Sequence, residues 1–146
     1  MRGNKLAKMD DRGRLKVPRD FLKEIRAAYG PAVYVTSITG KSSRIYPLPV
    51  WEAIESRLQK LPSTYKGKQK FLERTSYFGN ESSIDAQGRL LMHPLLRKTA
   101  GLDGELSVLG QGDYLEVWSM SALEQRIDSQ GDLTEEEYEA LAGAGV

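Results

Sequence analysis

A short run of alternating apolar and polar residues follows a turn-forming sequence near the start of the chain. Leu15 and Val17 are apolar, whereas Arg14 and Lys16 are charged. A period of two is typical of a strand that buries one face, so we expect a strand with the two charged side chains on its outward face. Pro18 ends the strand and suits the first turn of a helix.

The residues after this proline have a helical period. Their apolar stripe consists of Phe21, Leu22, Ile25 and Ala28. Gly30 follows where a C-terminal glycine cap is expected. Two strands, 32–38 and 43–46, and a helix over 49–58 complete this half of the chain.

The same order of elements recurs in the second half. Leu90 and Met92 alternate with Arg89 and Leu91, and Pro94 then precedes a short helix over 95–100 that is capped by Gly101. Strands are expected over 105–109 and 114–118. A closing helix is expected at a capping box formed by Ser121 and Glu124.

The two halves are also related in sequence. Residues 10–15, DDRGRL, return 75 residues later as DAQGRL. Each copy has an aspartate that can accept backbone hydrogen bonds and a glycine that can adopt positive φ. These residues are Asp10 and Gly13 in the first copy and Asp85 and Gly88 in the second. We therefore expect two equivalent turns in a pseudo-dimer that is folded from one chain.

This repeat divides the chain into four parts. We expect a first repeat over 1–61, a basic linker over 62–76, a second repeat over 77–128 and an acidic C-terminal tail over 129–146. The tail contains a second capping box, Thr134 with Glu137, and we expect a frayed helix there that adds little to a core.

The charges are segregated along the chain, although the net charge is only +1. From Arg2 to Arg26 there are nine lysines and arginines against four acidic residues, and from Arg57 to Arg74 there are six against one. From Asp113 onward there are nine acidic residues and one arginine. Such asymmetry is typical of a protein whose partner is a nucleic acid or another acidic surface, although solvated helix faces explain it equally well.

The composition excludes several classes of chemistry. The chain has no cysteine, and no cluster of ligands has the spacing of a metal site, so we expect neither a metal nor another cofactor. His93 is the only histidine and has no orienting partner at a matching spacing, which favours a structural role. Gly110-Gln111-Gly112 lacks the context of a phosphate loop and is better explained as a hairpin turn. We expect a protein that is not an enzyme.

No apolar run approaches the roughly 20 residues that a bilayer-spanning helix needs, and the N-terminus has no apolar signal-peptide core. We therefore expect no membrane contact and a cytoplasmic protein.

The repeated Asp-x-x-x-Arg sequence is the best candidate site. It could simply be a turn in which the aspartate pairs with the arginine. The first copy, however, holds more cations than two carboxylates can pair: Arg2, Lys5, Lys8, Arg12, Arg14 and Lys16. An exposed arginine at a strand start can contact phosphate or guanine edges, and its neighbours can hold the DNA backbone. We favour DNA contact for Arg14 and leave both interpretations open for Arg89.

Most aromatic residues are expected to be structural. Trp51, Trp118, Tyr46 and Phe21 fall on inward faces, where core packing is favoured over base stacking. Tyr77 and Phe78 precede the second turn, where they could pack between the halves or at a subunit interface.

Together these residues resemble the MraZ family of bacterial transcriptional regulators, which is related to the AbrB-type swapped-hairpin DNA-binding proteins. The resemblance is carried by Arg2-Gly3-Asn4, both Asp-x-x-x-Arg motifs, Tyr46–Trp51, Phe78-Gly79, Val108–Gly112 and Glu116–Trp118. It extends from residue 2 to about residue 128, and the acidic tail lies outside it.

The resemblance implies an α+β fold in which two intertwined β-rich repeats form a double-split, swapped-hairpin β-barrel with short flanking helices. It also implies a ring-shaped homo-oligomer at the nucleoid. This oligomer would bind repeated promoter boxes in double-stranded DNA and repress the division and cell-wall gene cluster. The DNA-contacting residues would be Arg14 and its counterpart Arg89, helped by Arg12, Lys16, Arg2 and Lys5. His93 departs from the proline that the family favours at this position.

Two other functions stay open at this point. An antitoxin-like regulator of the same fold would bind DNA and also mask a toxin through its tail. A protein-interaction module would use the basic strip to bind an acidic protein.

Overall fold

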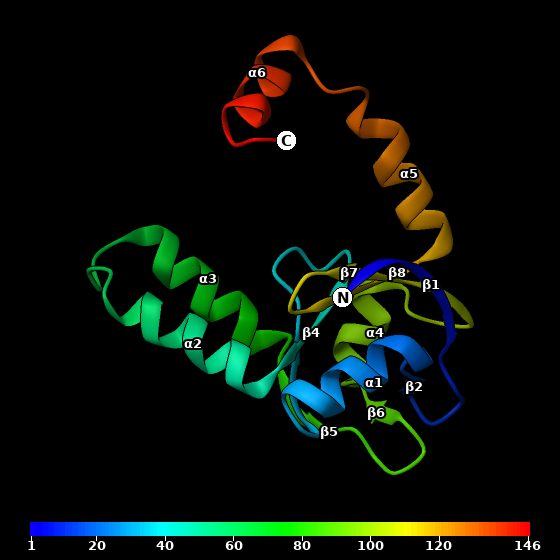
Figure 1. The fold of residues 1–146 in the computed structure, drawn as a ribbon. Helices are drawn as coiled ribbons and strands as arrows, with labels where there is room; N and C mark the ends of the chain where they lie inside the picture. Colours follow the sequence, from blue (N-terminus) through cyan, green and yellow to red (C-terminus); the bar gives the residue numbers. More distant parts are fainter.

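A six-stranded antiparallel sheet forms the centre of the molecule in the computed structural model, which describes residues 1–146 (Figure 1). Its strands, from one edge to the other, are β1 (Arg2–Lys8), β7 (Glu105–Gln111), β8 (Leu115–Ser119), β4 (Ser43–Pro47), β3 (Ala32–Thr36) and β5 (Asn80–Ser83). Two short strands, β2 (Arg14–Lys16) and β6 (Arg89–Leu91), pair with each other in a separate ribbon.

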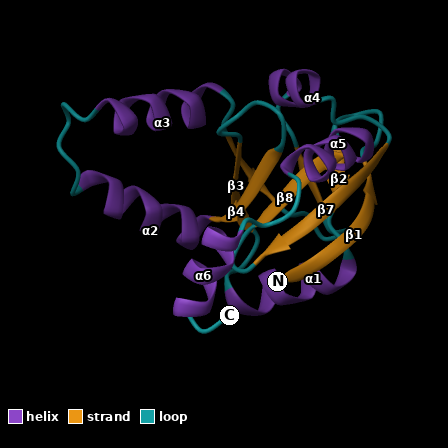
Figure 2. Ribbon diagram, turned by 90° about the horizontal axis from the view of Figure 1, so that it is seen from above, coloured by secondary structure: helices purple, strands orange, loops and turns teal.

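The chain also forms six helices: α1 (Arg19–Ala28), α2 (Leu48–Gln59), α3 (Lys66–Tyr77), α4 (Pro94–Ala100), α5 (Met120–Gln130) and α6 (Glu135–Gly143). The α2 and α3 helices project from the sheet as a helical hairpin (Figures 1 and 2). The α5 and α6 helices form an arm that extends away from the body (Figure 1). The mixed α and β content agrees with the expected class. None of these helices combines the length and the apolar composition that crossing a membrane requires.

The two halves exchange their first strands. β1 pairs with β7 of the second half, and β5 pairs with β3 of the first half. β4 and β8, the last strands of the two halves, pair with each other at the centre. Neither half therefore builds its part of the sheet alone. The sheet stays open at β1 and β5, so the closed barrel that the resemblance implies is not confirmed.

The main core lies between one face of the sheet and the layer formed by the ribbon, α1 and α4. Leu15 and Leu90 of the ribbon are fully buried there, together with Ile25 of α1 and Leu96 of α4. The predicted alternation of apolar and polar residues in both ribbon strands is thus confirmed. The burial of these side chains holds two three-residue strands that would not be stable by themselves.

Aromatic residues cover the other face of the sheet. Trp51 of α2 stacks on Tyr34 at 4.7 Å between ring centroids and lies 5.1 Å from Tyr46. Trp51 and Tyr46 are buried, and so are Trp118 and Phe21, which confirms the predicted structural roles of all four.

Three elements were not predicted from the sequence. The edge strands β1 and β5 have no alternation of apolar and polar residues, since β1 buries only Ala7 and β5 is entirely polar. The helix α3 occupies most of the expected linker over 62–76 and packs Phe71 against Trp51. At its end, Phe78 is buried and Tyr77 is exposed, and the two rings meet edge to face at 4.9 Å.

The helix caps confirm one prediction and correct another. In α6, the Thr134 hydroxyl and the Glu137 side chain form the expected capping box, and no residue of this helix is buried. The capping box expected at Ser121 is wrong. The cap of α5 is Ser119, whose hydroxyl accepts a hydrogen bond from the N–H of Ala122 at 3.2 Å, because β8 runs directly into the helix.

Candidate nucleic-acid interface

Two equivalent turns precede the ribbon strands, as predicted. The Asp10 carboxylate accepts hydrogen bonds from the N–H groups of Arg12 and Arg14, both at 2.9 Å. In the second turn Asp85 accepts them from Gln87 and Arg89, at 2.9 and 3.0 Å. Each aspartate thereby fixes the backbone from which the following arginine extends.

These hydrogen bonds lower the pKa of both aspartates. The main cause is the N–H of Arg14 for Asp10 and the N–H of Arg89 for Asp85. The Arg14 charge also contributes to the lowered pKa of both aspartates. The carboxylates therefore stay charged at neutral pH, where they can hold the turns.

The glycines of the two turns are needed for conformation and for space. Gly13 has φ of +77° and Gly88 has φ of +79°, which other residues adopt only with strain. A Cβ on Gly13 would lie 2.4 Å from the guanidinium carbon of Arg97, and one on Gly88 would lie 2.7 Å from the Leu22 side chain. Each turn therefore packs against a helix of the other half.

Each turn also bonds to the ribbon strand of the other half. The N–H of Met92 donates to the carbonyl of Gly13, and the N–H of Val17 donates to the carbonyl of Gly88, both at 2.9 Å. These reciprocal bonds extend the ribbon at both ends. The two repeated motifs consequently form one continuous surface.

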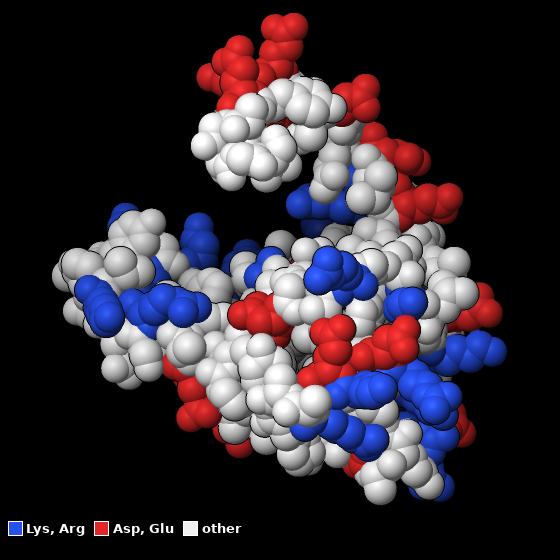
Figure 3. All heavy atoms as spheres, in the orientation of Figure 1, with Lys and Arg blue, Asp and Glu red and all other residues white.

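The register of the ribbon gathers cations on its outward face. Lys16 lies opposite Arg89, and Arg14 lies opposite Leu91, which is 51% exposed. Three cations thus occupy the two outward-facing residue pairs, which are separated by the buried pair Leu15 and Leu90. Paired residues lie about 5 Å apart across the strands. Figure 3 shows lysine and arginine gathered at the lower right, where Figure 1 places β2, β6 and α1.

Only part of the Arg14 guanidinium is available to a ligand. Its Nε donates to Asp10 at 2.9 Å, so the purely local pairing considered from the sequence does occur. Its side chain is still 34% exposed, and its two terminal nitrogens make no hydrogen bond within the chain. Arg89 differs, because its Nη1 donates to the Gln87 side chain at 2.6 Å instead of pairing with Asp85.

The remaining candidate cations are dispersed. Arg12 is exposed on the first turn, next to the ribbon. The Nζ of Lys5 lies 3.6 Å from an Asp20 oxygen, so this charge is partly paired. Arg2 begins β1 opposite Gln111, about 20 Å along the strand from Lys8. The ribbon therefore gathers Arg14, Lys16, Arg89 and Arg12 but not Arg2.

Two arginines that the sequence analysis did not select brace the turns. Arg26 of α1 donates to the carbonyl of Asp85 in the second turn at 2.8 Å. The guanidinium of Arg97 in α4 packs against Gly13 of the first turn, and its Nε donates to the carbonyl of Met92, in its own half, at 3.1 Å. The sequence repeat does not identify Arg97 as a candidate, because the equivalent residue 75 positions earlier is Leu22. Only its position in the last turn of a short helix marks it.

His93 has the structural role that was predicted. It is the N-cap of α4, and its Nδ1 accepts a hydrogen bond from the N–H of Leu95 at 3.1 Å. Gly112 has φ of +85° in the turn between β7 and β8, which confirms the predicted hairpin. No group of three or more potential metal ligands comes together in the chain.

The sequence matches the family described as "MraZ protein, putative antitoxin-like" over residues 1–74 and 79–142. A transcriptional regulator MraZ from Acidobacterium capsulatum is 40% identical over 145 residues, and one from Koribacter versatilis is 40% identical over 146; each alignment covers 99% of both chains. A transcriptional regulator MraZ from Nitrosomonas europaea is 36% identical over 88% of this chain and 86% of its own. The match to residue 142 corrects the expectation that the acidic tail lies outside the family resemblance.

Proposed function

Since the chain belongs to the MraZ family, we propose that it is a sequence-specific DNA-binding regulator of transcription that uses the β2–β6 ribbon as its DNA contact. The observation that carries this proposal is the outward face of the ribbon, where Arg14, Lys16 and Arg89 occupy the two outward-facing residue pairs. A two-stranded ribbon fits the major groove of B-DNA, where arginine can bind the O6 and N7 atoms of guanine. The relatives are named as regulators rather than as enzymes, in agreement with the expected absence of catalysis.

The two arginines would have different tasks. The Nε of Arg14 is held by Asp10, which fixes the plane of the guanidinium and leaves both terminal nitrogens for a bidentate contact. Arg89 and Lys16 would hold phosphates on either side. Asp10 and Asp85 would position the turns without contacting DNA themselves.

The proposal includes assembly. One three-residue ribbon contacts few base pairs, so several copies of the chain would be needed for tight binding to repeated boxes. We propose a ring-shaped homo-oligomer whose ribbons face successive promoter boxes at the nucleoid, with the swapped strands closing into a barrel in that assembly. Repression of the division and cell-wall gene cluster is the corresponding biological role.

Duplex binding by Arg14→Ala tests the proposal. We expect the affinity for repeated boxes from the chain's own upstream region to fall roughly tenfold or more for each engaged subunit. Arg14→Lys should recover only part of this loss, because lysine keeps the charge but not the bidentate geometry. Lys60→Ala, at the end of α2 and away from the ribbon, is the matched control.

Gel-shift titrations give these affinities, and circular dichroism checks that each variant is folded. Unchanged affinity in Arg14→Ala, Lys16→Ala and Arg89→Ala would disprove the ribbon as the DNA contact.

An antitoxin-like role is the second candidate, because the family description includes it and α6 has no packing partner within the chain. It predicts a complex with a toxin that is lost when α6 is removed.

A further inference from the structure

The last helix, α6, has no packing partner within the chain. None of its residues is buried, and Tyr138 is 59% exposed. An isolated helix of nine residues is marginal in water, even with a capping box at its start. The stability of α6 therefore calls for a surface outside its own chain.

The sides of α6 differ in chemistry. Its acidic residues are Glu135, Glu136, Glu137 and Glu139. Tyr138 and Leu141 are three residues apart and form an apolar side, which no part of the chain covers. Figure 3 shows the acidic side chains on the outer side of the arm and uncharged atoms on the side of α6 that faces the α2–α3 hairpin.

A surface of complementary chemistry lies around the loop between β3 and β4. Three hollows of about 130, 520 and 480 Å³ share Lys41 as a lining residue, and we call them together the Lys41 hollow. Their cationic lining residues are Lys41, Arg44, Lys70, Arg74 and Arg126, whereas Glu116 is the only acidic one.

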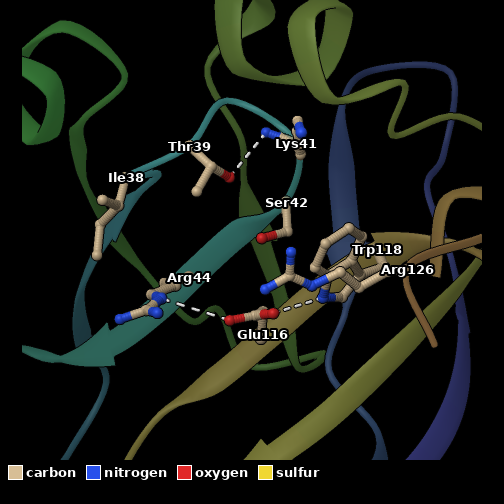
Figure 4. A pocket seen from close by; sticks show the side chains of 8 residues that line it. All are labelled: Ile38, Thr39, Lys41, Ser42, Arg44, Glu116, Trp118 and Arg126. Atoms are coloured by element: carbon tan, nitrogen blue, oxygen red, sulfur yellow. Dashed lines mark hydrogen bonds and ion pairs between the residues drawn. The ribbon is translucent and has the colours of Figure 1, made fainter. Parts of the chain in front are cut away.

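The single carboxylate of the hollow is already neutralised. Glu116 lies 3.4 Å from the Nε of Arg44, and it accepts a hydrogen bond from the indole of Trp118 (Figure 4). Lys41 and Arg126 line the same hollow and form no ion pair within the chain. The hollow consequently keeps a net positive charge that an acidic ligand would neutralise.

The hollow also has apolar walls. Ile38 and the ring of Phe71 line it on the α3 side, and Trp118 and Ala122 line it on the α5 side. A helix with one acidic and one apolar side matches this combination better than a small anion, which would leave the apolar walls uncovered. The chain itself supplies such a helix.

We propose that α6 of one copy docks in the Lys41 hollow of a second copy. Tyr138 and Leu141 cover Phe71 and the other apolar walls, and Glu136 and Glu139 pair with Lys41 and Arg126. The helix and the hollow are different surfaces, so the contact is head to tail and repeats from copy to copy until it closes a ring. The inference rests on the homo-oligomer of the proposed function and names the contact that would hold it together.

Charge reversal tests this contact by light scattering without DNA. One variant combines Lys41→Glu with Arg126→Glu, and the other combines Glu136→Lys with Glu139→Lys. We expect each variant to need about tenfold or more protein to assemble than the unmodified chain does. An equimolar mixture of the two should assemble again, since each acidic helix then meets a basic hollow and each basic helix an acidic one.

Both variants should fold, because the four altered side chains are exposed. Lys23→Glu on α1 reverses an exposed charge away from the hollow and should assemble like the unmodified chain. Unchanged assembly of both variants overturns the proposal, and it is the result expected if α6 folds back onto its own chain. A loss that mixing does not restore also overturns it, since it indicates a general effect of charge.

The same measurement separates this proposal from the proposed function. An unmodified chain that stays monomeric contradicts the homo-oligomer itself as well as the docking. An unmodified chain that assembles while both variants assemble equally well contradicts the docking alone. The DNA contact of the ribbon is measured separately, through Arg14.

Discussion

At the scale of single residues, the candidate interface depends on short-range hydrogen bonds. Asp10 holds the backbone and the side chain of Arg14 with its two carboxylate oxygens, one for each. Asp85 holds the backbone of Arg89 only, and Gln87 takes over the side chain. The two copies therefore share a turn but differ in how the arginine is positioned.

Acidification should weaken these turns. Because the folded-state pKa of Asp10 is lowered, its contribution to stability is complete above the unfolded-state pKa of about 3.9 and is lost as the pH falls through the folded value. Asp10→Asn should therefore lower the thermal unfolding midpoint at neutral pH and have progressively less effect below about pH 4. Unfolding followed by circular dichroism from pH 7 downward measures this difference.

Asp11→Asn is the control, since Asp11 is exposed and accepts no hydrogen bond within the chain. A difference between Asp10→Asn and the unmodified chain that stays constant down to pH 3 would contradict the assigned role of the Asp10 carboxylate.

At the scale of elements, the strand β1 depends on a close approach to its only neighbour in the sheet, β7. It lies at the edge of the sheet, where its charged side chains discourage pairing with other chains. Its first residues pass very close to β7, because Gly110 has no side chain. A Cβ there would lie 2.4 Å from the backbone nitrogen of Arg2, and the rigid backbone of β1 would have to move.

Gly110→Ala should detach the start of β1 from β7. We expect a loss of about 1–3 kcal/mol in the free energy of unfolding, the usual cost of overpacking. Denaturant titration measures the loss, and hydrogen exchange should show faster exchange at the start of β1. Gly143→Ala, where a Cβ meets nothing within 4 Å, should be nearly neutral. Equal stabilities of the two variants would contradict the close approach.

At the scale of the whole molecule, opposite charges lie at different ends. The cations of the ribbon and α1 lie at the bottom of the view in Figure 3, and the acidic arm of α5 and α6 lies at the top. An acidic arm near the ribbon would repel DNA, so this separation is compatible with DNA binding at one end and association through the other.

Salt should weaken DNA binding steeply. Each phosphate that the ribbon neutralises should contribute a slope of about −0.9 to the logarithm of affinity against the logarithm of salt concentration. Lys16→Ala should reduce the slope by about 1 for each engaged subunit. Fluorescence anisotropy between about 50 and 200 mM salt measures the slope. An affinity that stays flat over this range would rule out an electrostatic ribbon contact.

Much of the site could be predicted because its signals are local. An aspartate and a glycine three residues apart specify a turn wherever they stand, and alternation from Arg14 to Val17 determines which side chains face outward. The edge strands β1 and β5 could not be predicted in this way. Nearly all of β1 is exposed on both faces, and β5 has only polar residues, so neither sequence alternates apolar with polar positions. The helix α3 was missed because its polar, basic sequence is also that of a linker.

The sequence by itself determined the doubled turn, the outward cations and the repetition of the two halves. Only the tertiary structure decided that β2 pairs with β6, that Arg26 hydrogen-bonds to the second turn and Arg97 packs against the first, and that Arg2 lies far from Arg14. The reason is physical. Turns and periodicity depend on neighbours within a few residues, whereas strand pairing and bracing depend on contacts between residues about 60 or more positions apart, which no local pattern records.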